Sequence, residues 1–146
     1  MRLTVLERVD LTPELRPDFE RISSLVDQEI GVLTGEVNLV ICDDSFIQGL
    51  NKQYRNKDQI TDVLTFPYYE GQTTQDELLG EVVIDLEQAQ RQADQGAWEL
   101  SMEMYKLFIH GLLHLRGYDH VEDADFRVMK LLEDKIMKSF LETCNA

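Results

Sequence analysis

All three histidines of this 146-residue chain lie in one stretch of eleven residues, HGLLHLRGYDH, which runs from His110 to His120. His110 and His114 are four residues apart, so a helix would place both imidazole rings on one face, one turn apart. Gly117 follows three residues after His114, and glycine readily adopts the left-handed backbone angles at which many helices end. The stretch therefore predicts a helix that ends near Gly117, followed by a turn that returns His120 to the other two rings.

Three imidazoles gathered in this way are a ligand set for a metal ion. Zinc sites that are purely structural usually have four protein ligands, whereas catalytic sites have three and leave one position open. The chain has no further histidine and no nearby cysteine to serve as a fourth ligand. We therefore predict an open Zn²⁺ site at His110, His114 and His120, with nickel, cobalt and iron as alternatives because they also accept imidazole. We assign no firm role in metal binding or catalysis to Asp119.

The residue after the first histidine separates this pattern from a large class of zinc proteases. The spacing H-x-x-x-H-x-x-G-x-x-H occurs in such enzymes. Proteases with the H-E-x-x-H motif, however, carry a glutamate at the second position as general base. Gly111 stands there in this chain, so the sequence argues against peptide hydrolysis.

The hydrophobic pattern predicts four strands and five helices in one domain that spans residues 1–146. The expected strands are 2–9, 36–42, 61–66 and 79–84, and the expected helices are 13–33, 43–54, a helix headed by Asp85, 98–115 and 123–141. A helix between the first two strands indicates a parallel crossover, and the polar segment 69–77 indicates an antiparallel hairpin. The predicted fold class is α/β (α+β), with a small mixed sheet packed by the helices and the metal site on a buried helix and the following turn.

Two finer expectations concern the helices. Gln88 lies three residues after Asp85, in the position of a capping box. The last helix has an apolar stripe that should face the core, made of Phe126, Met129, Leu132, Ile136 and Phe140.

Charge and cysteine content limit the partners and the compartment. The net charge of −14 opposes phosphate binding unless a basic cluster, a bound cation or a partner protein offsets it.

Cys42 and Cys144 form no C-x-x-C pair, and we expect both to be reduced thiols. The sequence contains neither an apolar run long enough for a membrane span nor a signal-peptide pattern at its start, so we expect a cytosolic protein.

Arg55 is the candidate phosphate ligand. It ends a predicted helix and enters a loop, in a small basic island with Lys52 and Lys57. A planar guanidinium binds phosphate oxygens with two parallel hydrogen bonds and can stabilise negative charge in a transition state. The alternative is an ordinary ion pair with a surface acid, which composition alone favours. Nearby tyrosines could stack on unpaired bases or simply pack against the fold: Tyr54, Tyr68 and Tyr69.

The segments LNKQYR…TDVLTFP, LGEVVID and HGLLHLRGYDH, in this order and at these separations, resemble the YbeY family of endoribonucleases, also called ribosomal RNA maturation factors. The resemblance runs from about Leu50 to His120. It implies that the three histidines bind zinc and that Arg55 is the catalytic or phosphate-contacting residue. Thr65 stands where the family commonly has serine, and GEV where GDI is common.

The resemblance also implies an activity and its setting. The expected activity is metal-dependent cleavage of single-stranded RNA, in small-subunit ribosomal RNA maturation and ribosome quality control. The expected partners are ribosomal RNA and the small ribosomal subunit or its associated proteins, in the cytoplasm, with neither DNA nor a membrane involved. Two alternatives stay open: a non-catalytic ribosome-assembly factor stabilised by zinc, and a metal-dependent peptide hydrolase.

Overall fold

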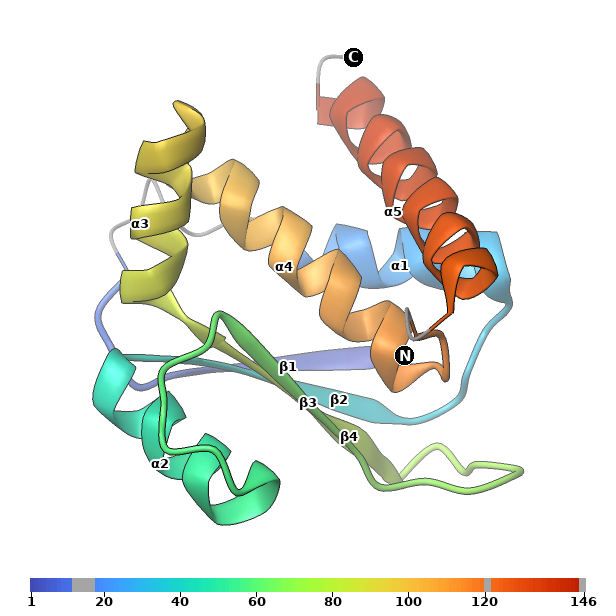
Figure 1. The fold of residues 1–146 in the computed structure, drawn as a ribbon. Helices are drawn as coiled ribbons and strands as arrows, with labels where there is room; N and C mark the ends of the chain where they lie inside the picture. Colours follow the sequence, from blue (N-terminus) through green and yellow to red (C-terminus); the bar gives the residue numbers. More distant parts are fainter. Residues whose placement is uncertain (12–17, 120–121, 145–146) are drawn as a thin grey trace.

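The computed structural model describes residues 1–11, 18–119 and 122–144, and it arranges them as a sheet with helices on both faces (Figure 1). All of the predicted strands and helices form. In chain order they are β1 (Arg2–Glu7), α1 (Phe19–Ile30), β2 (Glu36–Cys42), α2 (Asp44–Arg55), β3 (Val63–Pro67), β4 (Leu78–Asp85), α3 (Leu86–Gly96), α4 (Leu100–Leu115) and α5 (Asp123–Cys144).

The sheet is mixed, with strand order β1-β2-β4-β3. The pairs β1–β2 and β2–β4 are parallel, and β3 pairs with β4 in the antiparallel sense. Both expectations about the connections are therefore confirmed: a helix joins the parallel strands β1 and β2, and the polar segment joins the hairpin β3–β4. Among the described residues β3 lies at the edge of the sheet and pairs with β4 alone.

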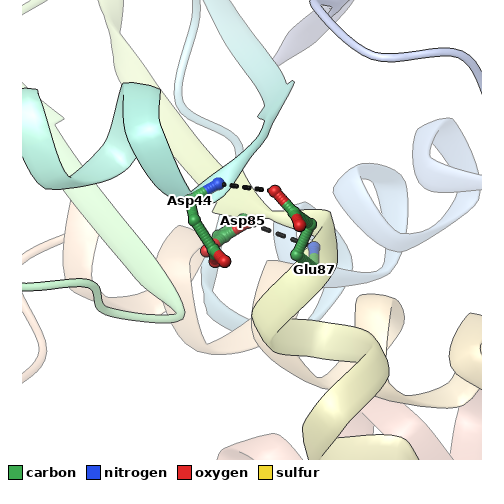
Figure 2. A group of neighbouring side chains, drawn as sticks. All are labelled: Asp44, Asp85 and Glu87. Atoms are coloured by element: carbon green, nitrogen blue, oxygen red, sulfur yellow. Dashed lines mark hydrogen bonds between the residues drawn. The ribbon is translucent and has the colours of Figure 1, made fainter.

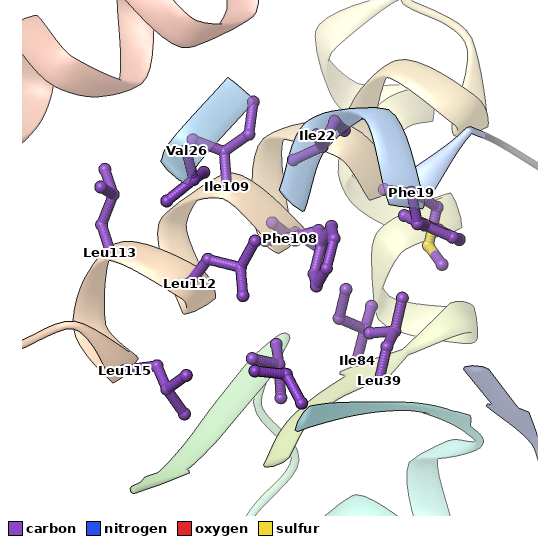
Figure 3. Packing of buried hydrophobic residues seen from close by; sticks show 14 of the residues in the cluster. Phe19, Ile22, Val26, Leu39, Ile84, Phe108, Ile109, Leu112, Leu113 and Leu115 are labelled. Carbon is purple, nitrogen blue, oxygen red and sulfur yellow. The ribbon is translucent and has the colours of Figure 1, made fainter. Parts of the chain in front are cut away.

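The larger core lies on the face of the sheet covered by α1, α4 and α5 (Figure 1). Figure 3 shows Phe108 and Leu112 of α4 pointing toward Leu39 and Ile84 of the sheet, and all of these side chains are fully buried. The opposite face packs mainly against α2, through Ile47 and its neighbours. The chain thus places α4, which carries two of the histidines, directly against the sheet.

Helix boundaries differ from the expectations where local capping decides them. Helix α1 begins at Phe19 because the Asp18 side chain accepts a hydrogen bond from the backbone of Arg21, and it ends before Gly31 at φ 97°. The expected start of this helix at residue 13 lies outside the described residues. Ala97 adopts φ 59° and separates α3 from α4. Trp98 therefore precedes α4 and does not belong to it, contrary to expectation.

Two finer predictions about the helices are wrong. The Gln88 side-chain oxygen accepts from Arg91, and the Asp85 backbone N–H donates to the carbonyl of Asp62, so the reciprocal bond of a capping box does not form. The Asp85 carboxylate itself caps the helix. Phe126, expected in the buried stripe of α5, is 55% exposed, whereas Met129, Ile136 and Phe140 are buried as expected. None of the helices in the described ranges combines the length and the apolar character that a bilayer crossing requires.

Candidate active site

Helix α4 brings His110 and His114 together as the spacing predicts. Their Nε2 atoms are 3.1 Å apart, and the centroids of the two rings are separated by 4.6 Å. Two nitrogen ligands of a tetrahedral zinc ion, each about 2.05 Å from it, lie about 3.3 Å apart. The separation of the two Nε2 atoms is therefore close to the one that a shared ion requires. His120, the third expected ligand, lies outside the described residues.

Glu133 of α5 orients the first of these rings. Its Oε1 lies 2.7 Å from Nδ1 of His110, and its side chain is only 18% exposed. Because an ionised carboxylate can only accept, Nδ1 carries the proton and Nε2 keeps its lone pair for a metal. The local sequence pattern did not indicate a role for Glu133. The available signal was a carboxylate on the buried stripe of α5, since Glu133 lies between Met129 and Ile136 at helical spacing.

Arg55 is the last residue of α2, and the left-handed backbone of Asn56, at φ 58°, ends the helix there. The guanidinium reaches the edge strand and donates from Nη2 to the carbonyl oxygen of Thr65, at 2.7 Å. It also lies over the ring of Phe66, 5.3 Å from the ring centroid. The hydrogen bond to β3 fixes the position of Arg55 beside the strand, which is a different arrangement from the surface ion pair considered above.

Arg55 and the two histidines line one cavity of about 550 Å³. The edge strand β3 forms much of its wall, so residues from α2, α4 and β3 meet there although they are far apart in sequence. The cavity is lined by Arg55, Thr61, Asp62, Val63, Leu64, Thr65, Pro67, His110 and His114. A second cavity of about 370 Å³ adjoins it and shares Asp62 and His110 with it.

Asp62 and the tyrosines have specific places around this cavity. The Asp62 carboxylate accepts a hydrogen bond from the backbone of Val63, at 2.7 Å, as a cap at the start of β3. Tyr69 donates its hydroxyl to the carbonyl of Leu115 at the end of α4, which is a packing role. Tyr54 and Tyr68 remain more than half exposed.

Gly111 lies at a close contact between α4 and the sheet. A Cβ atom at this position would be 2.5 Å from Cγ1 of Val82, and the Thr65 hydroxyl donates to the Gly111 carbonyl at 3.3 Å. The site therefore has no space for the glutamate that H-E-x-x-H proteases place after the first histidine. Threonine at position 65 supplies the same hydroxyl donor that serine would.

The family model described as Endoribonuclease YbeY matches residues 6–141. The chain belongs to the YbeY family of endoribonucleases. The resemblance drawn from the three sequence segments is thereby confirmed. Among the YbeY relatives, the Endoribonuclease YbeY of Carboxydothermus hydrogenoformans is 39% identical over 91% of each chain. That of Heliobacterium modesticaldum is 36% identical over 91% of this chain and 90% of its own.

A solved structure has a similar fold. The solution structure of TM1509 from Thermotoga maritima superposes with a TM-score of 0.62 at 28% identity. The similarity covers 97% of this chain and 93% of the other. The fold described above is therefore shared over almost the whole chain.

Proposed function

We propose that this chain is a zinc-dependent endoribonuclease that cleaves single-stranded RNA. The observation that carries the proposal is the shared cavity, in which Arg55 faces the same space as His110 and His114. Membership of the YbeY family and the name Endoribonuclease YbeY of its relatives support an RNA substrate.

The proposed roles follow from the donors that each side chain offers. Arg55 has five N–H groups, of which the Thr65 carbonyl uses one, so the others are available to the oxygens of the scissile phosphate. His110, His114 and, from its spacing in the sequence, His120 would hold the zinc ion. When bound, zinc would act as a Lewis acid toward negative charge on the phosphate. Glu133 keeps His110 in the tautomer that can bind the metal.

The proposal extends to the biological setting that the family resemblance implies. We place the activity in maturation of small-subunit ribosomal RNA and in ribosome quality control, in the cytoplasm, with the small subunit or its associated proteins as partners. The net charge of −14 supports a role for such partners, because a strongly acidic protein attracts RNA poorly.

The metal ligands are tested by His114→Ala, measured by zinc content and by cleavage of a labelled single-stranded RNA. We expect loss of bound zinc together with loss of cleavage. Full cleavage without bound metal would contradict the proposal.

Arg55 is tested by Arg55→Lys, which keeps the charge and removes the planar pair of donors. We expect kcat to fall by roughly 10²- to 10³-fold, the size of effect seen when one donor to a developing negative charge is lost. Arg21→Lys, the same exchange at an exposed position of α1, is the control and should leave cleavage unchanged. Normal cleavage by Arg55→Lys would contradict a role of the paired donors of Arg55 at the scissile phosphate.

A further inference from the structure

A group of three acidic side chains that includes none of the histidines lies at the carboxyl ends of the neighbouring parallel strands β2 and β4 (Figure 2). Asp44 is the first residue of α2, Asp85 is the last residue of β4, and Glu87 lies in the first turn of α3. One carboxylate oxygen from each lies within 4.8 Å of the other two. Loops at the carboxyl ends of parallel strands are a common place for ligand sites in α/β folds.

Helix capping explains only part of this group. Oδ1 of Asp85 accepts a hydrogen bond from the backbone of Glu87, at 3.1 Å, and so caps α3. The other oxygen, Oδ2, is the buried side-chain oxygen that lacks a hydrogen-bond partner within the described residues, and the Asp85 side chain is fully buried. A buried carboxylate oxygen without a partner is unfavourable, so this atom points to a missing ligand.

The charges of the group are only partly offset. Arg91 donates from Nη2 and Nη1 to the two carboxylate oxygens of Asp44, at 2.6 and 3.1 Å. The Asp44 backbone N–H donates to Oε1 of Glu87, at 3.1 Å, which holds Glu87 over the group (Figure 2). One guanidinium against three carboxylates leaves an excess of negative charge when all are ionised. Each carboxylate oxygen can accept more than one bond, so Arg91 does not use up the ligand capacity of Asp44.

We propose that Asp44, Asp85 and Glu87 form a binding site for a divalent cation of the Mg²⁺, Ca²⁺ or Mn²⁺ type. These cations take carboxylate oxygens as ligands and complete their coordination with water. Such an ion supplies the partner that Oδ2 of Asp85 lacks and balances the excess negative charge. The proposal is independent of RNA cleavage and of the histidines.

A proton is the competing explanation. Burial, the close contact with the Asp44 carboxyl group and the negative charge of Asp44 together raise the pKa of Asp85 to about 7. A proton shared between Asp85 and Asp44 would also satisfy the buried oxygen. The two explanations separate above neutral pH, where a cation competes successfully with the proton.

The test measures Mn²⁺ binding to the full chain at pH 8 by electron paramagnetic resonance. Zinc is supplied before the Mn²⁺, so that it occupies the histidines. We expect Asp85→Asn to lose one bound Mn²⁺ per chain relative to the wild type, and excess Mg²⁺ or Ca²⁺ to displace that ion. Asp94→Asn is the matched control, since Asp94 is an exposed carboxylate further along α3, and it should bind Mn²⁺ as the wild type does.

Thermal unfolding gives a second readout and a second variant. Saturating Mg²⁺ should raise the Tm of the wild type and of Asp94→Asn, and it should not raise that of Asp85→Asn. If Asp85→Asn does not fold, Glu87→Gln, at an exposed position, should bind Mn²⁺ roughly tenfold more weakly, about the effect expected for removing one favourable charge contact. Equal Mn²⁺ binding by the variants and the wild type, or a wild-type stability that depends on pH and not on Mg²⁺, would overturn the proposal.

Discussion

At the scale of single residues, the geometry of the candidate site depends on contacts between distant parts of the chain. The ring of His110 is oriented by Glu133, which is 23 residues away on another helix. In the part of the chain that the structure describes, Arg55 is held by a backbone carbonyl of β3 and forms no ion pair with an acid. A guanidinium whose charge is not neutralised by an acid is well suited to an anionic ligand, because no ion pair must be broken first.

Glu133→Gln tests the orienting role of this carboxylate. The amide keeps the size of the side chain but removes the negative charge that favours the Nδ1 proton of His110, and loss of such a partner commonly lowers metal affinity 10- to 100-fold. We expect a loss of zinc affinity of roughly that size, measured by competition with a chelating dye. Asp134→Asn is the control, since Asp134 is the neighbouring exposed acid and pairs with Lys130. Equal zinc affinity in Glu133→Gln and the wild type would show that the contact has no such role.

Cys42 provides a second prediction at this scale. Its thiol is fully buried in the sheet, and burial, followed by the charge of Asp85, raises its pKa to about 12. Alkylation requires an accessible thiolate, so iodoacetamide at pH 8 should label Cys42 in a Cys144→Ser background only after unfolding in urea. Rapid stoichiometric labelling of the native protein would contradict the placement of Cys42.

At the scale of helices and strands, most of the architecture could be predicted from the sequence, because strong hydrophobic periodicity and turn residues define the strands and the long helices. The hairpin followed from the polar segment 69–77, and the parallel crossover followed from the helix between the first two strands. The predictions that failed concerned positions that depend on tertiary contacts or on local helix capping. Trp98 looked helical, but its indole N–H donates to Glu103 from outside the helix. Phe126 fitted the apolar stripe but lines a cavity in the folded chain.

The candidate site could be predicted only in part, for the same reason. The pattern of histidines is local, so the pairing of His110 and His114 followed from helix geometry. Two further contacts of the site join different helices and strands, so no local sequence pattern indicates them. They are the contact of Glu133 with His110 and the hydrogen bond of Arg55 to Thr65.

The close approach of α4 to the sheet gives a prediction with an internal control. Gly111→Ala would place a methyl group 2.5 Å from Val82 Cγ1, and overpacking of this kind costs about 1–3 kcal/mol. Gly49 lies in α2 with no atom within 4 Å of the corresponding Cβ position, so Gly49→Ala should stabilise the protein by up to about 1 kcal/mol through helix propensity. Urea unfolding measures both. A stabilised Gly111→Ala would contradict the packing of α4 against β4.

At the scale of the whole molecule, the charge distribution limits how RNA can bind. The chain carries a net charge of −14, and the acidic Asp62 lines the same cavity as Arg55. Long-range attraction of RNA is therefore weak, and affinity for naked RNA should come from a few short-range phosphate contacts. Exposed charges are screened beyond about 10 Å at 0.1 M salt, so such contacts dominate at ordinary ionic strength.

This charge distribution predicts slow cleavage of naked RNA and a strong dependence on salt. In a plot of log affinity against log salt concentration, each phosphate contact with a single strand contributes a slope of about −0.7. About three such contacts would lower the affinity for RNA by roughly tenfold or more when the salt concentration rises from 50 to 200 mM. The measurement is kcat/KM for a single-stranded RNA over that range of potassium chloride, with and without purified small ribosomal subunits. If partners deliver the substrate, the subunits should raise the rate and weaken its salt dependence. Equal rates at low and high salt on naked RNA would contradict binding through phosphate contacts, and Arg55 would then need a role other than holding the phosphate.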